Sequence, residues 1–146
     1  MKTLNKIQKT LSVEKGQMNK FGGYKYRNCE DILNAVKPML DEATLTLSDE
    51  IVLIGDRFYI KATATFKEGD SVEVVTAYAR EALDKKGMDD SQITGSTSSY
   101  ARKYALNGLF CIDDTKDADT LNAGDEKPRA GLKFIDNTID SSMDLN

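Results

Sequence analysis

The sequence predicts an α+β domain: a three-stranded antiparallel β-meander flanked by helices and followed by a flexible acidic tail. Three β-rich runs, at residues 45–54, 57–67 and 71–80, are separated by short turns containing glycine and aspartate. Such turns between β-rich runs are hairpin signals. Helical periodicity precedes and follows the runs. The 146 residues are 40% hydrophobic and 30% charged, which is typical of one globular domain with some solvated tail.

Two short helices are expected before the meander. Apolar residues at helical spacing between residues 4 and 11 define one stripe, and lysines occupy the other faces. Asn28 and Asp31 are spaced as a capping pair and open the second helix. Pro38 should kink or end that helix, because proline lacks a backbone N–H and clashes with the preceding turn.

The middle strand has the clearest alternation of the three. One face carries Phe58, Ile60, Ala62, Ala64 and Phe66, and the other face is cationic with a tyrosine. Arg57, Tyr59 and Lys61 on that second face are candidates for contact with nucleic acid. An ordinary solvated sheet face explains these three residues equally well.

Residues 93–106 form the most informative segment, because a hydroxyl-rich helix entry leads into paired tyrosines and paired cations. Hydroxyls and amides of a first helical turn accept phosphate, cations neutralise backbone charge, and tyrosines stack bases. We expect a helix from about Ser91 to Asn107, ending before Gly108. The segment predicts a nucleic-acid surface.

Helical geometry divides this segment into two sides. One side holds Ile93, Thr97, Tyr100, Ala101 and Tyr104, and the opposite half holds Ser96, Ser99, Arg102 and Lys103. If the apolar side packs on the sheet, Tyr100 and Tyr104 are expected in the core rather than against bases. The opposite half then supplies the phosphate contacts. Gly95 permits close approach of a backbone, either DNA or a neighbouring helix.

Charge is unevenly distributed along the chain. Residues 1–27 hold seven basic residues against one acidic residue, and residues 113–146 hold nine acidic against four basic residues. A basic arm and an acidic tail result. DNA contact and a solvated amphipathic helix are equally consistent with the arm. Its candidate contacts are Lys20, Lys25 and Arg27 for phosphate and Tyr24 and Tyr26 for stacking, and the two tyrosines are equally consistent with a short edge strand.

The string GSTSSYARKYALNGLFCIDD, at residues 95–114, resembles the signature of the essential recombination function (Erf) family of phage-type single-strand annealing proteins. Residues 24–26 and 36–40 are similar to two further elements of that family, so the resemblance spans roughly residues 4–119. Lys37 and Lys103 stand where the family commonly has arginine. Lysine keeps the charge but lacks the bidentate fork, so a phosphate contact there is less directional.

The resemblance implies a function and partners. It implies ATP-independent binding and annealing of complementary single-stranded DNA in homologous recombination, by rings or filaments of many subunits. A single-strand-binding protein or a partner exonuclease is a further expected partner. We expect residues 1–119 to form the annealing core and residues 120–146 a disordered acidic tail.

Several other classes are disfavoured by the sequence. No apolar stretch is long enough to cross a bilayer, and the N-terminus lacks the apolar block of a signal peptide, which predicts a cytoplasmic protein. Cys29 and Cys111 are isolated and histidine is absent, so one chain offers no disulfide framework or zinc cluster. A phosphate-binding Gly-rich loop with Lys-Ser/Thr is also absent. We therefore expect no cofactor.

Two alternative functions remain open. A partner-binding adaptor would use the acidic tail to recruit a host single-strand-binding or recombination protein. A metal-dependent nuclease would use the carboxylates between residues 113 and 119. Their spacing fails as a calcium loop, because Ala118 replaces the required glycine and Gly124 the final glutamate.

Overall fold

A three-stranded antiparallel sheet forms one layer of the fold. The computed structural model describes residues 1–113, in which β3 (Thr44–Ile54), β4 (Arg57–Glu68) and β5 (Ser71–Arg80) pair in that order. The register places Ala62 of β4 opposite Asp49 of β3 and Ala77 of β5. The strands lie within one residue of the predicted runs, so the meander is confirmed.

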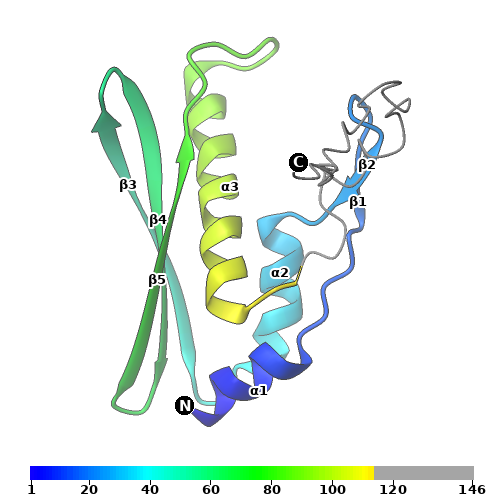
Figure 1. The fold of residues 1–146 in the computed structure, drawn as a ribbon, viewed down its shortest axis with the longest axis vertical. Helices are drawn as coiled ribbons and strands as arrows, with labels where there is room; N and C mark the ends of the chain where they lie inside the picture. The colour runs from blue at the N-terminus through cyan, green and yellow to red at the C-terminus, as the bar shows by residue number, and fades with distance from the viewer. Residues whose placement is uncertain (114–146) are drawn as a thin grey trace, which may run out of the picture. The chain divides into compact units, whose positions relative to one another are not determined.

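The elements before the sheet are short. They are α1 (Lys2–Thr10), the hairpin of β1 (Gln17–Asn19) and β2 (Tyr24–Tyr26), α2 (Cys29–Val36), and a single 3-10 turn, η1 (Lys37–Met39). The hairpin and α2 lie on the side of the long helix α3 that faces away from the sheet (Figure 1). The domain therefore has three layers: the sheet, α3, and the N-terminal elements.

Local sequence sets the ends of α2 as predicted. The Asn28 side chain accepts a hydrogen bond from the Asp31 amide, and the Asp31 carboxylate accepts one from the Asn28 amide, both at 2.8 Å. This capping box satisfies two backbone donors at the start of the helix. The α-helix ends at Val36, and Pro38 stands inside the 3-10 turn that follows.

The long helix α3 (Asp90–Phe110) begins one residue before its predicted start, at a capping box of Asp89 and Gln92. The predicted end at Asn107 is wrong, because the helix continues through Gly108. A Cβ at Gly108 would lie 3.1 Å from Cγ1 of Val75, so the glycine lets α3 approach β5 closely. The helix ends instead at a residue in the left-handed conformation, Cys111 (φ +53°).

The core differs between the two halves of α3. The second half is buried on several sides, because the sheet packs on one side and α1 and α2 on the other. Its buried residues are Ala101, Ala105, Leu106, Leu109 and Phe110. Phe110 meets Phe66 of β4 edge to face, with ring centroids 6.2 Å apart. The first half buries only Ile93 and Thr97, which leaves the rest of its surface accessible.

The predicted apolar face of β4 is correct for four of its five residues. Ile60, Ala62, Ala64 and Phe66 are buried, whereas Phe58 is 50% exposed. Phe58 lies at the β3–β4 turn, the end of the sheet that stands apart from α3 in Figure 1. The expectation that Phe58 enters the core is therefore wrong, because α3 does not cover this end.

No helix within residues 1–113 is sufficiently long and apolar to cross a membrane. The predicted boundary at residue 119 and the predicted tail of residues 120–146 lie outside the described residues.

Candidate nucleic-acid interface

The β1–β2 hairpin holds its own tip together. The Asn19 side chain accepts hydrogen bonds from the amides of Phe21 and Gly22 and donates one to the Tyr24 hydroxyl at 2.9 Å. The Tyr24 ring covers Gly22, where a Cβ would lie 2.4 Å from a ring carbon. Gly23 has φ +65°, a conformation that favours glycine. These contacts hold the tip with Phe21 fully exposed.

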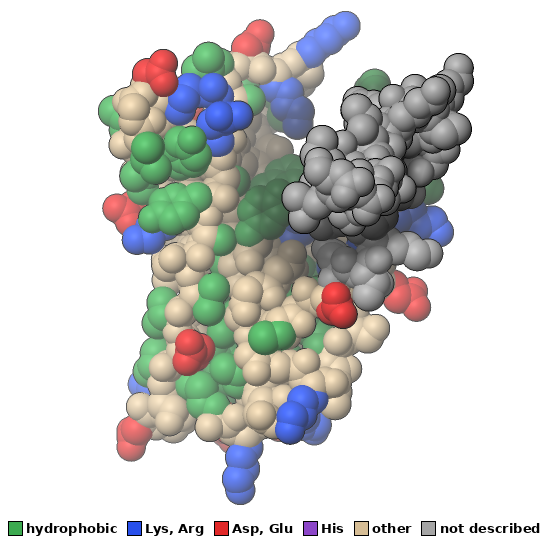
Figure 2. Space-filling model, viewed as in Figure 1, with side chains coloured by type: hydrophobic (Ala, Val, Ile, Leu, Met, Phe, Trp, Pro, Cys, Tyr) green, Lys and Arg blue, Asp and Glu red, His purple; other side chains and the backbone are tan. Residues whose placement is uncertain are grey.

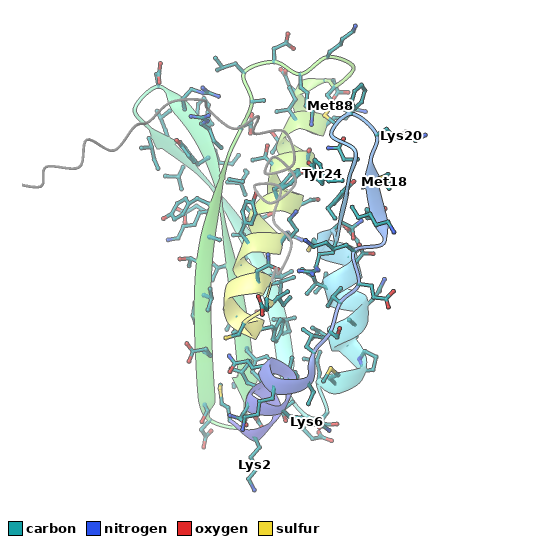
Figure 3. All side chains as sticks on the ribbon, turned by 45° about the vertical axis from the view of Figure 1, so that its right-hand side comes forward. Lys2, Lys6, Met18, Lys20, Tyr24 and Met88 are labelled. Atoms are coloured by element: carbon teal, nitrogen blue, oxygen red, sulfur yellow. The ribbon has the colours of Figure 1, made fainter. Side chains whose placement is uncertain are left out.

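A groove of about 580 Å³ lies between this hairpin and the first half of α3. Figure 3 shows Met18, Lys20 and Tyr24 on the hairpin and Met88 just before α3. Aromatic, cationic and hydroxyl side chains line the groove together. The principal ones are Phe21, Tyr26, Tyr100, Lys20, Lys85, Lys103, Ser96 and Ser99.

A second hollow of about 390 Å³ lies between β5 and the other flank of α3. Tyr78, Arg80 and Tyr104 line it, and it shares Lys85, Ser96 and Tyr100 with the groove. Figure 2 shows hydrophobic side chains at the floor of a hollow in the region where Figure 1 draws the first half of α3. Tyr100 therefore stands between two adjoining depressions.

Tyr100 and Tyr104 are 43% and 47% exposed, so the prediction that they pack in the core is wrong. Each precedes a buried alanine by one residue, which turns it about 100° around the helix from that buried position. The two ring centroids are 6.2 Å apart. Burial raises the pKa of the Tyr100 hydroxyl, and the neighbouring tyrosines raise it further. Tyr100 therefore remains neutral at physiological pH.

The Lys103 ammonium lies among three tyrosine rings. Its Nζ is 4.6 Å from the ring centroid of Tyr100, 5.7 Å from that of Tyr104 and 5.8 Å from that of Tyr26. These distances are within the range of cation–π attraction. Lys103 thus connects β2 to α3 across the floor of the groove.

Arg102, the second predicted cation of this helix, is engaged in a partly exposed ion pair with β3. Its Nε and Nη2 each lie 3.0 Å from a carboxylate oxygen of Asp49, which also accepts a hydrogen bond from the Ser98 hydroxyl. Burial alone would raise the pKa of Asp49, but the hydrogen bonds from Arg102 and Ser98 lower it. The hydrogen bond to Asp49 raises the pKa of Arg102. This cluster joins α3 to β3.

Arg27 is also placed in the fold rather than at the groove. Its side chain is buried, and its Nε donates to the Val13 carbonyl at 3.1 Å. The bond connects the end of the hairpin to the segment after α1. Lys25 is exposed, and its alternation with Tyr26 along β2 places the two side chains on opposite faces.

The predicted contacts on the sheet lie apart from the groove. Tyr59 and Lys61 face away from α3, because their neighbours Ile60 and Ala62 are buried beneath it. Arg57 Nη2 donates to the Glu81 carbonyl at 3.0 Å. The structure therefore does not bring these three residues together with the residues of α3.

Gly95 and Ser96 lie in the first half of α3, near the groove. Gly95 is exposed, and a Cβ built there would meet no atom within 4 Å. Packing within residues 1–113 therefore gives no reason for a glycine, which costs about 0.5–1 kcal/mol relative to alanine in a helix interior. The expected close approach of a neighbouring helix is not made within the described chain.

The basic arm is divided between two ends of the domain. Lys2 and Lys6 lie on α1, at the opposite end from Lys20 in Figure 3. Only the hairpin part of the arm reaches the groove. The positive charge of residues 1–27 is therefore spread along the domain rather than gathered at the groove.

Comparison with known proteins gives the family. A family model of the ERF superfamily matches residues 1–134. The chain belongs to the ERF superfamily. It is 62% identical over 117 residues to the Essential recombination function protein of Salmonella phage P22, an alignment that covers 80% of this chain. The chain spans 57% of the length of that relative. The resemblance to the Erf family is confirmed.

In this ERF-superfamily chain, sequence reasoning did not find Phe21 or Lys85 as groove residues. Lys85 and Lys86 form a basic pair shortly before the signature helix, and Phe21 is an aromatic residue beside two glycines. Both were available as signals. These signals indicate a groove only if the hairpin lies opposite α3, and local sequence does not specify that arrangement.

Among residues 1–113, no group of three or more histidine, cysteine, aspartate or glutamate side chains is arranged to hold a metal ion. The acidic residues from Asp114 onward, which prompted the nuclease alternative, lie outside the described part of the chain.

We predict that Asp49→Asn lowers the free energy of unfolding by about 1 kcal/mol at pH 7, because it removes a partly exposed, bidentate ion pair. Since the pKa of Asp49 is lowered in the folded state, this stability is present above about pH 4, the ordinary pKa of an aspartate, and is lost as the pH falls further. Urea unfolding of both proteins from pH 7 to pH 3 measures the difference.

Glu42→Gln, which removes one charge at an exposed position, serves as the control and should change stability little. An Asp49→Asn difference that stays constant down to pH 3 would contradict the role given to the Asp49 carboxylate.

Proposed function

We propose that this chain binds single-stranded DNA in the groove between the β1–β2 hairpin and α3. As an oligomer, it anneals complementary strands without ATP during homologous recombination. The relative from phage P22 is named for recombination. The observation that carries the proposal is the lining of the groove, where aromatic rings and lysine ammonium groups are brought together from the hairpin, the loop before α3 and α3 itself.

This lining has the chemistry that non-specific single-strand binding requires. Lys20, Lys85 and Lys103 supply positive charge for the phosphates, and Tyr26 and Tyr100 supply ring faces for the bases. The Ser96 and Ser99 hydroxyls add donors for phosphate oxygens. Every base has a π-face, so stacking tolerates any sequence.

Annealing does not require a change of covalent bonds. The protein has to reduce the repulsion between two phosphate backbones, hold one strand extended, and leave the hydrogen-bonding edges of its bases accessible. Stacking contacts engage the faces of the bases and leave those edges accessible. A groove lined with tyrosines and lysines meets these requirements without ATP.

The structure changes the roles that we assign to the predicted contacts. Lys20 and Lys103 remain the preferred phosphate contacts, and Lys85 joins them. Arg102 and Arg27 become structural, because their guanidinium groups bond to Asp49 and to the Val13 carbonyl. The remaining predicted contacts lie outside the groove, and a bound DNA strand would have to extend beyond it to reach them. They are Lys25 on the hairpin and Arg57, Tyr59 and Lys61 on the sheet.

Oligomerisation is part of the proposal, since one small domain offers few contacts to a strand and several copies multiply them. Both β3 and β5 are edge strands of the described sheet. Ile51, Leu53 and Phe58 expose apolar side chains at the β3–β4 turn. Unpaired edges and exposed apolar patches are features of surfaces that associate.

We predict that the double substitution Lys20→Ala and Lys103→Ala slows annealing of two complementary fluorescent oligonucleotides and weakens single-strand binding. Each lost phosphate contact lowers the slope of log affinity against log salt by about 0.7, so the slope should fall by about 1.4. Binding titrations across a salt series, without ATP or magnesium, measure this slope.

The matched control is Lys2→Ala with Lys6→Ala, which removes the same charge from α1 at the opposite end of the domain. It should leave the salt slope and the annealing rate nearly unchanged. Equal losses in the two double variants would mean that net charge, rather than the groove, governs binding.

We predict that Gly95→Ala has opposite effects on stability and on binding. Alanine should raise the free energy of unfolding by about 0.5–1 kcal/mol, because it favours the helix and meets no neighbour. If a strand approaches the backbone at Gly95, the added methyl group should weaken DNA binding. Urea unfolding and a binding titration of the same preparation test both parts.

A variant that is more stable and binds DNA as tightly as the original protein would remove Gly95 from the proposed interface.

A further inference from the structure

The ring face of Tyr100 is occupied by a group that can leave it. The Lys103 ammonium lies 4.6 Å from the Tyr100 ring centroid, closer than to the ring of Tyr104 or Tyr26. An ammonium over a ring face takes the place that a stacked base would take. A lysine head on its flexible four-carbon stem can reorient readily.

Tyr100 also lies at the boundary between two depressions that a bound strand could pass through. It lines both the groove beside the hairpin and the hollow beside β5. Its side chain is 43% exposed, so part of the ring is accessible to a ligand. Across the groove, the fully exposed Phe21 ring forms the opposing aromatic wall.

We propose that Tyr100 is the stacking platform for one unpaired base of a bound strand, and that Lys103 moves from the Tyr100 ring to the strand's phosphate when that base arrives. The ligand class is a nucleotide with an unpaired purine or pyrimidine and a 3′ or 5′ phosphate. This inference rests on the proposed single-strand binding and deepens it.

The Lys103 ammonium and the Tyr100 ring each have a partner both in the free protein and in the complex. In the free protein the ammonium is stabilised by the quadrupoles of the tyrosine rings, and in the complex by the negative charge of a phosphate. The base replaces the ammonium on the ring, so neither the ring nor the cation loses a partner. The cation–π cluster thereby keeps the platform ordered before DNA binds, which lowers the entropy cost of binding.

The sequence contains no tryptophan, so the fluorescence of one introduced tryptophan reports on its surroundings without background from other indoles. In the full-length chain, Tyr100→Trp introduces a single indole at the platform. We expect a thymidine oligonucleotide to quench its fluorescence. Val72→Trp, at an exposed position near the β4–β5 turn, should not be quenched and serves as the control.

Affinity measurements separate stacking from phosphate contact. An oligonucleotide of the same length with abasic sites in place of its bases should bind the original protein more weakly, by about fivefold to 150-fold for each stacked base. Tyr100→Ala should weaken binding of the thymidine strand by a similar factor and should not weaken binding of the abasic strand. Tyr100→Phe keeps the ring face and should bind as the original does.

Three outcomes decide between these possibilities. Weaker abasic binding, quenching in the Tyr100→Trp variant but not in the Val72→Trp control, and rescue by phenylalanine together support the platform. Equal binding of the thymidine and abasic strands, without quenching, would overturn the platform while leaving single-strand binding intact. Absence of binding to either strand by the folded original protein would overturn both the platform and the proposed function.

Discussion

The enclosure of the second half of α3 is the constraint on which the rest of the structure depends. Phe110 meets Phe66 of the sheet on one side, while α1 and α2 cover the other side. Gly108 allows the close approach to β5 that this packing needs. Burial of apolar surface is the main favourable term in folding, so this half of the helix holds the three layers together.

The first half of α3 is not enclosed in this way. It buries only a narrow stripe, and the hydrogen bond from the Ser98 hydroxyl to Asp49 ties it to β3 through polar groups. Its outward surface can therefore carry hydroxyls and the Tyr100 ring, and Lys103 and Tyr104 follow on the next turn of the helix. One continuous helix thus combines a buried, structural half with a half that exposes polar and aromatic side chains, and the rigid helix keeps the spacing of Tyr100, Lys103 and Tyr104 fixed.

The elements of the fold could be predicted because their signals are local. Alternation along β4, the Asn28 and Asp31 pair and Pro38 each act within a few residues, and the structure confirms all three apart from the exposed Phe58 at the start of β4. The end of α3 could not be predicted, since the reason for Gly108 is the Val75 side chain of another strand.

The candidate site was less accessible to sequence reasoning, because its geometry depends on distant partners. The tyrosines of α3 were assigned to the wrong side, since their orientation depends on which narrow stripe the sheet covers. Asp49 and Arg102 are 53 residues apart in the sequence. The hairpin that faces α3 is separated from it in the sequence by α2, η1 and the three strands of the meander. Residue types at the site were recognised, but the contacts that divide structural from accessible cations were not.

The most direct test of strand binding in the groove is to map which residues a bound oligonucleotide contacts. A thymidine oligonucleotide carrying 5-iodouracil, crosslinked by light to the full-length chain, reports the aromatic residues that contact its bases through mass spectrometry of the peptides. We expect adducts at Tyr100 and Tyr26, on the two walls of the groove. Adducts confined to Tyr59, on the sheet face away from α3, would contradict it.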